Sequence, residues 1–375
     1  MKKRYAVRDL LLVSLAFLVV AVASCKKSHN VINNTTTKNA TPAHLGLYET
    51  DSSIYKLIYL DVSKVGTQTI NDGMIFDTGS GGMVLDAEGT LPKSMITSTG
   101  FNFSGDSVVY DGITITKDTA SIQYGDDAAS QATVYGNLAY ADVTLDAEGG
   151  NVVIKRLPFF LYYKAVDAKG KLQPAHDFDV FGVNEEYDVK FENGSKYITS
   201  PLSYYVPGTG LDKGFKIAAL GTSNFSLNST YVKNVVTLGL TPADLQSSGF
   251  VLSSLNPSGY GYEPIISGTI TYNHSTITSP LLFDSGTEPY NYIEDYNAPT
   301  HLDSLSNNAA VGIATKSGFN YNFTVTSTPQ QGEYLTYVEN PRVSGTDVSI
   351  FSLEYFLNNE YLLDFTTHQL GLKNN

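Results

Sequence analysis

Two aspartates in matching settings are the residues of this chain whose pattern most clearly suggests chemistry. Asp77 lies in IFDTGS, and Asp284 lies in LFDSGT, 207 residues further along the chain. In each copy an apolar residue and a phenylalanine lead into the aspartate, and a Ser/Thr-Gly-Ser/Thr turn follows it. A single Asp-Thr-Gly is a weak signal because ordinary β-turns contain it. Two copies with matched flanks indicate a pair that acts together.

Two carboxylates held side by side can hydrolyse an amide without a metal ion or a covalent intermediate. Because they cannot both ionise at close range, they share one proton, so that one acts as a base toward water and the other as an acid toward the carbonyl oxygen. Holding them together requires two similar loops that face each other, with a glycine behind each aspartate so that the backbones can approach closely. The alternative is that both aspartates only cap turns.

The segments around these loops have the composition of β-strands. Short runs of alternating apolar and polar residues recur between Gly, Asn and Asp, for example in TASIQYG, NVVIKRL and EPIISGTITY. Such runs predict an all-β protein. Two short helices are expected: one in LTPADLQSSG, with Thr241 as N-cap and Pro242 as its first residue, and one in SLEYFLNNE near the C-terminus.

From residue 45 onward the chain resembles the pepsin-like aspartic proteases. Besides the two aspartate turns, it has a Gly66-Thr67 turn before the first aspartate and a Tyr124-Gly125 pair where that family has the tip of a hairpin flap. Val180-Phe181-Gly182 matches the apolar-apolar-Gly segment that passes beneath the first aspartate loop. The C-terminal IFSLEYFLNNEYLLDFTTHQLGL is similar to the closing segment of the family.

This resemblance implies a bilobal fold of two β-barrel lobes, related by a pseudo-two-fold axis, with an active-site cleft between them. The first lobe is expected to span residues 45–200 and the second residues 201–375. Asp77 and Asp284 would be the catalytic pair of an endopeptidase. The residues expected to support that pair are Thr78, Gly79, Ser80, Ser285, Gly286 and Thr287.

The hydroxyl residues of this set would have two roles. Thr78 and Ser285 would bond across to the opposite loop, and Ser80 and Thr287 would donate hydrogen bonds to the carboxylates. Donation to an ionised carboxylate lowers its pKa, which predicts an acid-shifted optimum. Tyr124 and Gly125 would close over a protein or peptide substrate bound in extended form. The resemblance implies a monomer that needs no cofactor and no metal ion.

Three departures from the family pattern keep a second function open. Gly81 and Gly82 follow the first turn, the acidic pair Asp126-Asp127 follows Tyr124-Gly125, and the second apolar-apolar-Gly segment reads Ile350-Phe351-Ser352. The rival interpretation is a catalytically silent pepsin fold that binds a peptide, a glycan or another enzyme at the cell surface. A structural lipoprotein of an unrelated β fold is a third possibility.

The N-terminal residues have the pattern of a bacterial lipoprotein signal peptide. A basic start precedes an apolar run at residues 10–22, which is short for a transmembrane helix, and Val-Ala-Ser leads into Cys25, the only cysteine. We expect residues 1–24 to be the signal peptide, Cys25 to carry lipid and residues 25–44 to be a flexible tether. The protein would then be anchored in the cell envelope, at the outer membrane or cell surface rather than the inner membrane. The alternative is an ordinary secretory signal followed by a chance cysteine.

Charge and histidine content exclude other classes of function. The chain has a net charge of −13, which becomes −16 once residues 1–24, with four basic residues and one acidic residue, are removed. Without a cluster of lysines and arginines it has no surface suited to nucleic acid. The six histidines show no metal-binding spacing, so the sequence predicts no zinc site.

Overall fold

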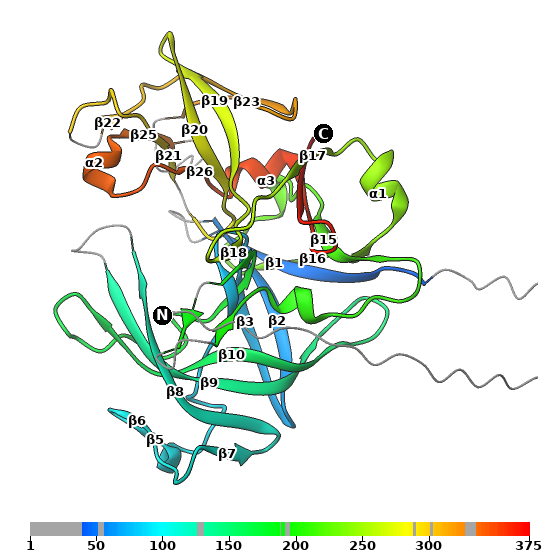
Figure 1. Ribbon diagram of the computed structural model, residues 1–375, viewed down its shortest axis with the longest axis vertical. Coiled ribbons are helices and arrows are strands. Elements are labelled where there is room, and N and C mark those ends of the chain that lie inside the picture. Colours follow the sequence, from blue (N-terminus) through cyan, green and yellow to red (C-terminus); the bar gives the residue numbers. More distant parts are fainter. Residues whose placement is uncertain are drawn as a thin grey trace, which may run out of the picture. The chain divides into compact units, whose positions relative to one another are not determined.

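The computed structural model describes residues 40–51, 56–125, 131–187, 189–191, 196–287, 290–300, 303–326 and 335–375. In these residues the chain is mainly β-structure, which confirms the all-β prediction (Figure 1). The signal-peptide pattern, Cys25 and the acidic pair after Gly125 lie outside the described residues. No helix within the described ranges is long and apolar enough to cross a membrane.

One large sheet contains 14 strands in the order β17-β28-β27-β15-β16-β1-β2-β3-β11-β4-β10-β9-β8-β7. Its strands, in chain order, are β1 (Ala43–Asp51), β2 (Lys56–Val65), β3 (Gln68–Asp77), β4 (Gly81–Asp86), β7 (Ser107–Tyr110), β8 (Ile113–Tyr124), β9 (Ala132–Leu145), β10 (Val152–Asp167), β11 (Val180–Val183), β15 (Asp212–Ile217), β16 (Thr230–Leu240), β17 (Val251–Ser254), β27 (Asn359–Asp364) and β28 (Gln369–Asn374).

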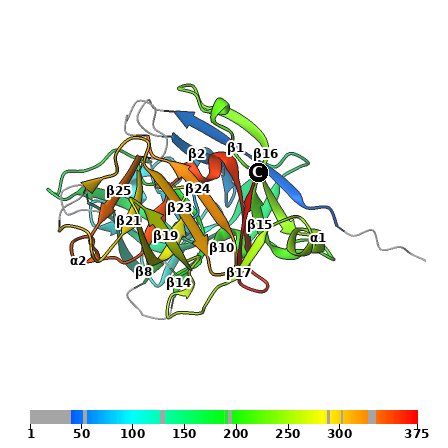
Figure 2. The same ribbon diagram turned by 90° about the horizontal axis from the view of Figure 1, so that it is seen from above.

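A second sheet contains eight strands in the order β22-β25-β21-β26-β20-β19-β23-β24 (Figure 2). Its strands are β19 (Ile266–Tyr272), β20 (Ser275–Phe283), β21 (Tyr290–Glu294), β22 (Asp303–Ser304), β23 (Ala310–Thr315), β24 (Asn320–Thr324), β25 (Leu335–Glu339) and β26 (Ser349–Phe351). Burial alternates along β19, which is the period-two pattern of a strand with one buried face.

The remaining elements are short. Paired two-residue strands are β5 (Ile96–Thr97), β6 (Gly100–Phe101), β12 (Glu185–Glu186), β13 (Val189–Lys190), β14 (Tyr197–Ile198) and β18 (Gly261–Tyr262). The helices are α1 (Pro242–Gln246), α2 (Pro341–Ser344), α3 (Glu354–Asn358) and 3-10 turns at Lys93–Met95, Pro201–Tyr204 and Thr222–Asn224.

Helices α1 and α3 confirm the two helices predicted from the sequence. The Thr241 side chain accepts a hydrogen bond from the backbone N–H of Asp244, and the Asp244 carboxylate accepts one from the N–H of Thr241, so α1 begins with a capping box. Helix α2, which Asn340 caps, was not predicted.

Part of the large sheet closes on itself, and the rest extends it. In the large sheet β2 pairs with both β3 and β9, so the strands β2-β3-β11-β4-β10-β9 form a closed barrel. The strands β15, β16, β27 and β28, from the second half of the chain, extend this sheet through the pairing of β16 with β1. The sheet therefore spans the expected boundary between residues 200 and 201, and the boundary itself stays a prediction.

The strand arrangement around the two aspartates repeats. Strand β11 lies between β3 and β4, parallel to the first and antiparallel to the second. Strand β26 lies between β20 and β21 with the same two orientations. In each sheet a later segment therefore fills the gap between the strand that ends at an aspartate and the strand that follows it.

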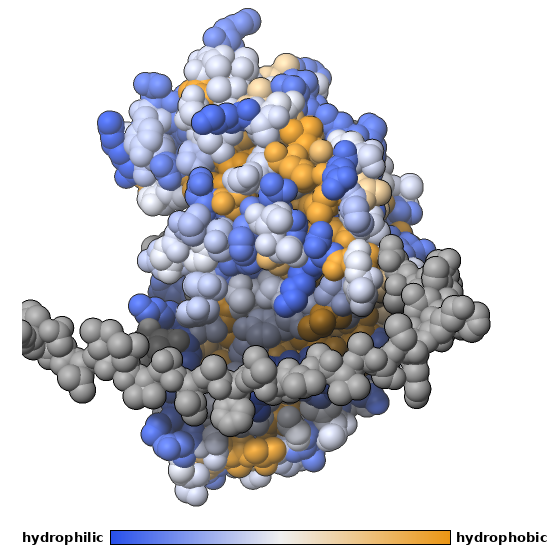
Figure 3. Space-filling model, turned by 45° about the vertical axis from the view of Figure 1, so that its right-hand side comes forward, coloured by the Kyte–Doolittle hydropathy of each residue, from blue (hydrophilic) through white to orange (hydrophobic). Residues whose placement is uncertain are grey.

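The interior is apolar, and the residues that precede the two aspartates pack into it. Phe76 and Phe283, the residues before the two aspartates, are fully buried and belong to the same large hydrophobic cluster. Large exposed apolar side chains occur at scattered positions such as Val109, Leu227 and Val343. On the face shown in Figure 3, hydrophobic patches are bordered by hydrophilic residues.

Candidate active site

The first aspartate lies at the end of β3, where the chain turns before β4. The backbone N–H of Gly79 donates to Oδ1 of Asp77 at 2.7 Å, and the hydroxyl of Ser80 donates to Oδ2 at 2.5 Å. Both oxygens of this carboxylate are thus held by residues of its own turn. Asp77 itself is only partly buried, so solvent can reach it.

The second aspartate has the same partners in the same order. The N–H of Gly286 donates to Oδ1 of Asp284 at 2.7 Å, and the hydroxyl of Thr287 donates to Oδ2 at 2.6 Å. Asp284 immediately follows β20 and is also partly buried. The repeated Asp-Thr/Ser-Gly-Ser/Thr sequence therefore corresponds to a repeat in hydrogen bonding.

Thr78 and Ser285 join the two loops through four hydrogen bonds. The hydroxyl of Thr78 donates to the carbonyl of Phe283 at 2.9 Å and accepts from the N–H of Ser285 at 2.9 Å. In return, the hydroxyl of Ser285 donates to the carbonyl of Phe76 at 2.8 Å and accepts from the N–H of Thr78 at 3.0 Å. Both side chains are 0% exposed, so water does not compete for these bonds.

This brace brings the two carboxylates together. A Cβ added to Gly79 would lie 2.3 Å from Cγ of Asp284, and one added to Gly286 would lie 2.6 Å from Cγ of Asp77. Each carboxylate therefore packs against the glycine of the opposite turn, where no side chain has room. Burial raises the pKa of Asp284 well above its ordinary value, and the charge of Asp77 and a hydrogen bond to its side chain raise it further.

Strands β11 and β26 pass beside the first and the second aspartate loop, respectively. Gly182 on β11 lies opposite Asp77, and a Cβ at this position would lie 2.6 Å from Oγ and 2.7 Å from the carbonyl oxygen of Ser80. The equivalent position after β26 is Ser352, which is fully buried. The backbone N–H of Ser352 donates to Oδ1 of Asn291 at 2.9 Å, and its hydroxyl bonds to Asn291 and to Glu354.

A buried tyrosine near the pair was not anticipated. Tyr361 on β27 is 1% exposed, and its hydroxyl has no hydrogen-bond partner among the residues that the structure describes. Burial raises the pKa of Tyr361, and the charges of Asp284 and Asp77 raise it further, which places the phenol within electrostatic reach of both carboxylates. No local pattern indicates this contact, because Tyr361 is one of 26 tyrosines and lies 77 residues after Asp284.

Tyr124 and Gly125 lie at the end of the hairpin formed by β8 and β9. Tyr124 pairs with Ala132, which is the pair of these two strands nearest to residues 126–130, outside the described ranges. Gly125 has a φ of +102°, a backbone conformation that favours glycine. The ring of Tyr124 stacks on Phe178 with centroids 5.6 Å apart and planes at 27°.

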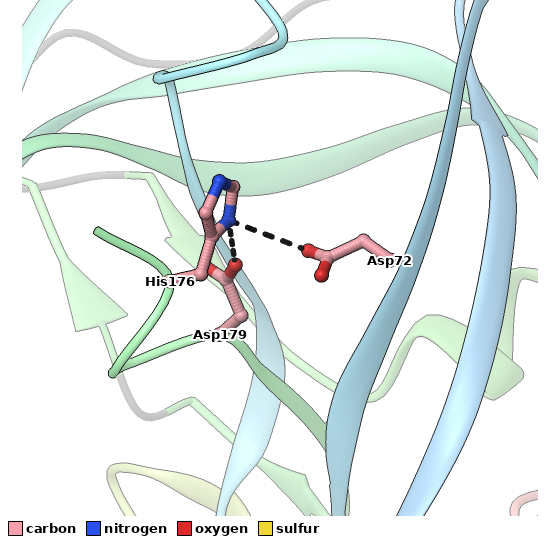
Figure 4. A group of neighbouring side chains, drawn as sticks. All are labelled: Asp72, His176 and Asp179. Carbon is pink, nitrogen blue, oxygen red and sulfur yellow. Dashed lines mark hydrogen bonds and ion pairs between the residues drawn. The ribbon is translucent and has the colours of Figure 1, made fainter. Parts of the chain in front are cut away.

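A second cluster of chemically active side chains was not predicted from the sequence. One ligand atom each from Asp72, His176 and Asp179 lies within 4.8 Å of the others (Figure 4). Burial, followed by the neighbouring Asp72 carboxylate, raises the pKa of Asp179 to about 7. The spacing of the histidines could not reveal this group, since Asp72 is on β3 and the other two residues precede β11.

Comparison with known proteins supports the fold. The structure is similar to an aspartic proteinase from Irpex lacteus, with a TM-score of 0.56 and 15% identity, over 88% of this chain and 97% of that one. It is also similar to basic 7S globulin from soybean, with a TM-score of 0.56 and 13% identity, over 89% of this chain and 96% of that one. No protein-family model matches the sequence, and no curated protein matches it either.

At these identities the likeness establishes the architecture and no more. One of the two similar structures is named a proteinase and the other a globulin, so the fold by itself does not decide between an enzyme and a binding protein. The chain has the bilobal, mainly β fold of the pepsin-like aspartic proteinases.

Proposed function

We propose that the chain is an extracytoplasmic aspartic endopeptidase, which hydrolyses peptide bonds with a water molecule activated by Asp77 and Asp284. The observation that carries this proposal is the reciprocal brace between Thr78 and Ser285, which holds two equivalent loops so that their carboxylates meet. Residues that only capped separate turns would need no such bonds between loops 207 residues apart.

The environment of the pair suggests how the two roles divide. Because burial and the charge of Asp77 raise the pKa of Asp284, Asp284 keeps the shared proton in mildly acidic solution. Asp77 then accepts a proton from water as the water oxygen attacks the scissile carbonyl, while Asp284 donates its proton to the carbonyl oxygen. The tetrahedral intermediate collapses when Asp77 passes the proton it took from water to the amide nitrogen, which leaves as the amine, while one hydroxyl of the intermediate returns its proton to Asp284 as the carboxyl group of the product forms.

The substrate would be a protein or peptide bound in extended form. Such a chain can form backbone hydrogen bonds with strand edges and with the β8–β9 hairpin, where Tyr124 and Gly125 would cover it. We expect the chain to act as a monomer. We also expect it to need no cofactor, since both proton transfers are assigned to its own side chains.

The test is cleavage of a diverse peptide mixture by the full chain between acidic and neutral pH. We expect Asp77→Asn and Asp284→Asn each to lower the rate by about 10²- to 10⁴-fold, the range for loss of a general acid or base. Asp303→Asn, which removes an exposed carboxylate in the same half of the chain as Asp284, is the matched control. Cleavage by either active-site variant at the rate of the Asp303→Asn control would refute the proposal.

The rival function is a pepsin-fold binding protein, and two observations favour it. One similar structure is named a globulin, and Ser352 replaces the glycine that the family has at the second crossing. This reading predicts a folded chain that cleaves no peptide at any pH. It also predicts peptide or glycan binding that Asp77→Asn leaves unchanged.

We also propose that lipid on Cys25 anchors the protein in the cell envelope. This rests on the sequence of residues 1–25, because the signal and the lone cysteine have the spacing of a lipoprotein signal. Metabolic labelling with a fatty acid should mark the wild-type chain but not Cys25→Ser, and the variant should move from the membrane fraction to the soluble fraction. Equal labelling of both chains would exclude the anchor.

A further inference from the structure

Asp72, His176 and Asp179 form a compact group of ligand atoms away from the aspartate pair. Nδ1 of His176 lies 2.6 Å from Oδ2 of Asp179 and 3.8 Å from Oδ2 of Asp72. Figure 4 shows Nδ1 of the imidazole facing both carboxylates, with Asp72 contributed by β3 and the other two residues by the segment that leads into β11. Asp72 precedes Asp77 by five residues on an extended strand, so the group lies roughly 15 Å from the pair.

The negative charge of this group is poorly compensated. Asp86 also belongs to it, because its backbone N–H donates to Oδ1 of Asp179 at 2.6 Å and its Oδ2 accepts from the N–H of His176 at 3.0 Å. In the part of the chain that the structure describes, no lysine or arginine forms an ion pair with Asp72, Asp86 or Asp179. A single imidazole therefore faces three carboxylates, of which Asp179 is 3% exposed.

Among the described residues, two polar atoms in and beside the group are buried without a hydrogen bond of ordinary geometry. Oδ2 of Asp72, the oxygen nearest the imidazole, is one of them. The other is the hydroxyl of Tyr162, whose residue is 1% exposed. Tyr162 lies opposite Asp86 where β10 pairs with β4, and both residues line the same hollow. Buried polar atoms are nearly always satisfied, and a ligand between them would satisfy these.

We propose that Asp72, His176 and Asp179 bind one divalent transition-metal cation, with zinc or manganese as the chemical class. One imidazole nitrogen and two carboxylate oxygens form a mixed donor set that suits these ions. Calcium is disfavoured because it takes six to eight oxygen ligands. The ion would replace the direct contact between Nδ1 and Asp179, with the donors moving apart to roughly 3 Å, and would neutralise charge that no other described cation offsets.

The site has a route to solvent. His176 has a side chain that is 43% exposed. A hollow of about 340 Å³ lies beside the group, with Asp86, Tyr162 and Ala175 among its lining residues. A hydrated ion can therefore approach from the surface and exchange its waters for the protein ligands.

A bound cation would fasten the segment between β10 and β11 to β3. The backbone already joins these parts, since the N–H of Ile75 donates to the carbonyl of Asp179 at 3.0 Å. Phe178 lies between His176 and Asp179 in the chain, and its ring stacks on the ring of Tyr124. The ion would thus stiffen the segment between β10 and β11, on which Tyr124 of the β8–β9 hairpin packs, without contacting the aspartate pair.

The test is metal binding by the full chain after treatment with a chelator. Zn²⁺ and Mn²⁺ are titrated by calorimetry, with metal content measured after gel filtration. We expect one equivalent to bind to the wild type, and Asp72→Asn and His176→Gln each to weaken that binding at least about 10-fold. A thermal unfolding scan should show a metal-dependent rise in the midpoint for the wild type that both variants lose.

Two further variants serve as controls. Glu185→Gln alters the pair between His368 and Glu185, where the imidazole lies 2.8 Å from one carboxylate only, so binding should be unchanged. Asp284→Asn removes one carboxylate of the aspartate pair, and metal binding should again be unchanged. No bound equivalent in the wild type, or equal binding by the wild type and Asp72→Asn, would overturn the proposal. If Asp72→Asn fails to fold, His176→Gln gives the same comparison.

Discussion

The two aspartate loops reach nearly the same geometry on different supports. The first loop rests on a closed barrel and is crossed by a strand with Gly182 beneath it. The second is part of an eight-stranded sheet in which the described residues form no closing pairing, and it is crossed by a strand that ends before Ser352. Even so, the glycine N–H and the hydroxyl bond to each carboxylate at distances that agree within 0.1 Å between the two loops.

This comparison separates what the carboxylate pair requires from what it tolerates. The turn residues and the crossing strand occur in both halves, whereas barrel closure and the identity of the crossing residue do not. Gly182 is needed because the backbone of Ser80 occupies the space of a side chain. Beneath the second loop that space holds a polar group instead, in which Ser352 bonds to Asn291 and Glu354.

The largest effect is expected where the two loops touch. In Gly79→Ala and Gly286→Ala the new methyl group would overlap the opposite carboxylate, at 2.3 Å and 2.6 Å from its Cγ. The carboxylates must move apart, and misplacement by about 1 Å can lower a rate roughly 10²-fold. Peptide cleavage and a urea unfolding curve measure the two consequences.

Gly259→Ala is the matched control, because a Cβ there meets no atom within 4 Å. It should leave both the rate and the midpoint unchanged. Full activity in Gly79→Ala would mean that the loops are further apart than the brace implies.

The brace between the loops gives the next largest effect. Thr78→Val removes a hydroxyl that both donates and accepts, leaving the carbonyl of Phe283 and the N–H of Ser285 without that partner. Two buried groups left unsatisfied should lower the free energy of unfolding by about 2–4 kcal/mol, and Ser285→Ala should behave alike. Because both hydroxyls belong to one network, the double variant should lose less than the sum of the single losses. Additive losses in urea unfolding would show two independent contacts.

A reciprocal exchange at the crossing residues tests the asymmetry itself. Gly182→Ser places a side chain 2.6 Å from Oγ of Ser80, and such overpacking should lower the free energy of unfolding by about 1–3 kcal/mol. Ser352→Gly leaves Glu354 and Asn291 with one hydrogen bond fewer, and the loss should be of similar size. If Ser352→Gly instead stabilised the chain, the polar group would be a strained substitute for the glycine. Unfolding curves at one pH compare the two variants.

Local patterns made the core of the candidate site predictable from the sequence. The all-β character, helices α1 and α3 and the two turns each depend on residues close together in the chain, so alternation, capping and the Asp-Thr/Ser-Gly repeat were sufficient. The pairing of β11 with β3 and β4 was accessible only through the family resemblance, since nothing near Gly182 indicates its partner strands.

What the sequence could not reveal depends on distant residues that the fold brings together. Tyr361 approaches the pair through β27, and Asn291 approaches Ser352 from β21. His176 meets Asp72 only because β11 inserts next to β3. In each case one partner is an ordinary residue type at an unremarkable position, and the chemistry follows from long-range strand order rather than from a motif.

The smallest effect concerns the pH dependence of the second loop. Burial and Asp77 favour protonated Asp284, so the stability that this proton provides is present below the ordinary pKa of an aspartate and is lost as the pH rises through the raised pKa. The Thr287 hydroxyl bonds to Asp284 and lowers its pKa. Thr287→Val should therefore move the alkaline limb of the pH profile of kcat/KM to higher pH, by about one unit or less.

The same variant has a readout that does not need activity. The pH at which the free energy of unfolding stops falling should rise together with the alkaline limb, because both report loss of the same proton from the folded chain. Thr271→Val, on the exposed face of β19, removes a threonine hydroxyl from the same half of the chain and should shift neither profile. A downward shift in Thr287→Val would mean that its hydroxyl stabilises the protonated pair, and the equivalence of the two loops would then be limited to their geometry.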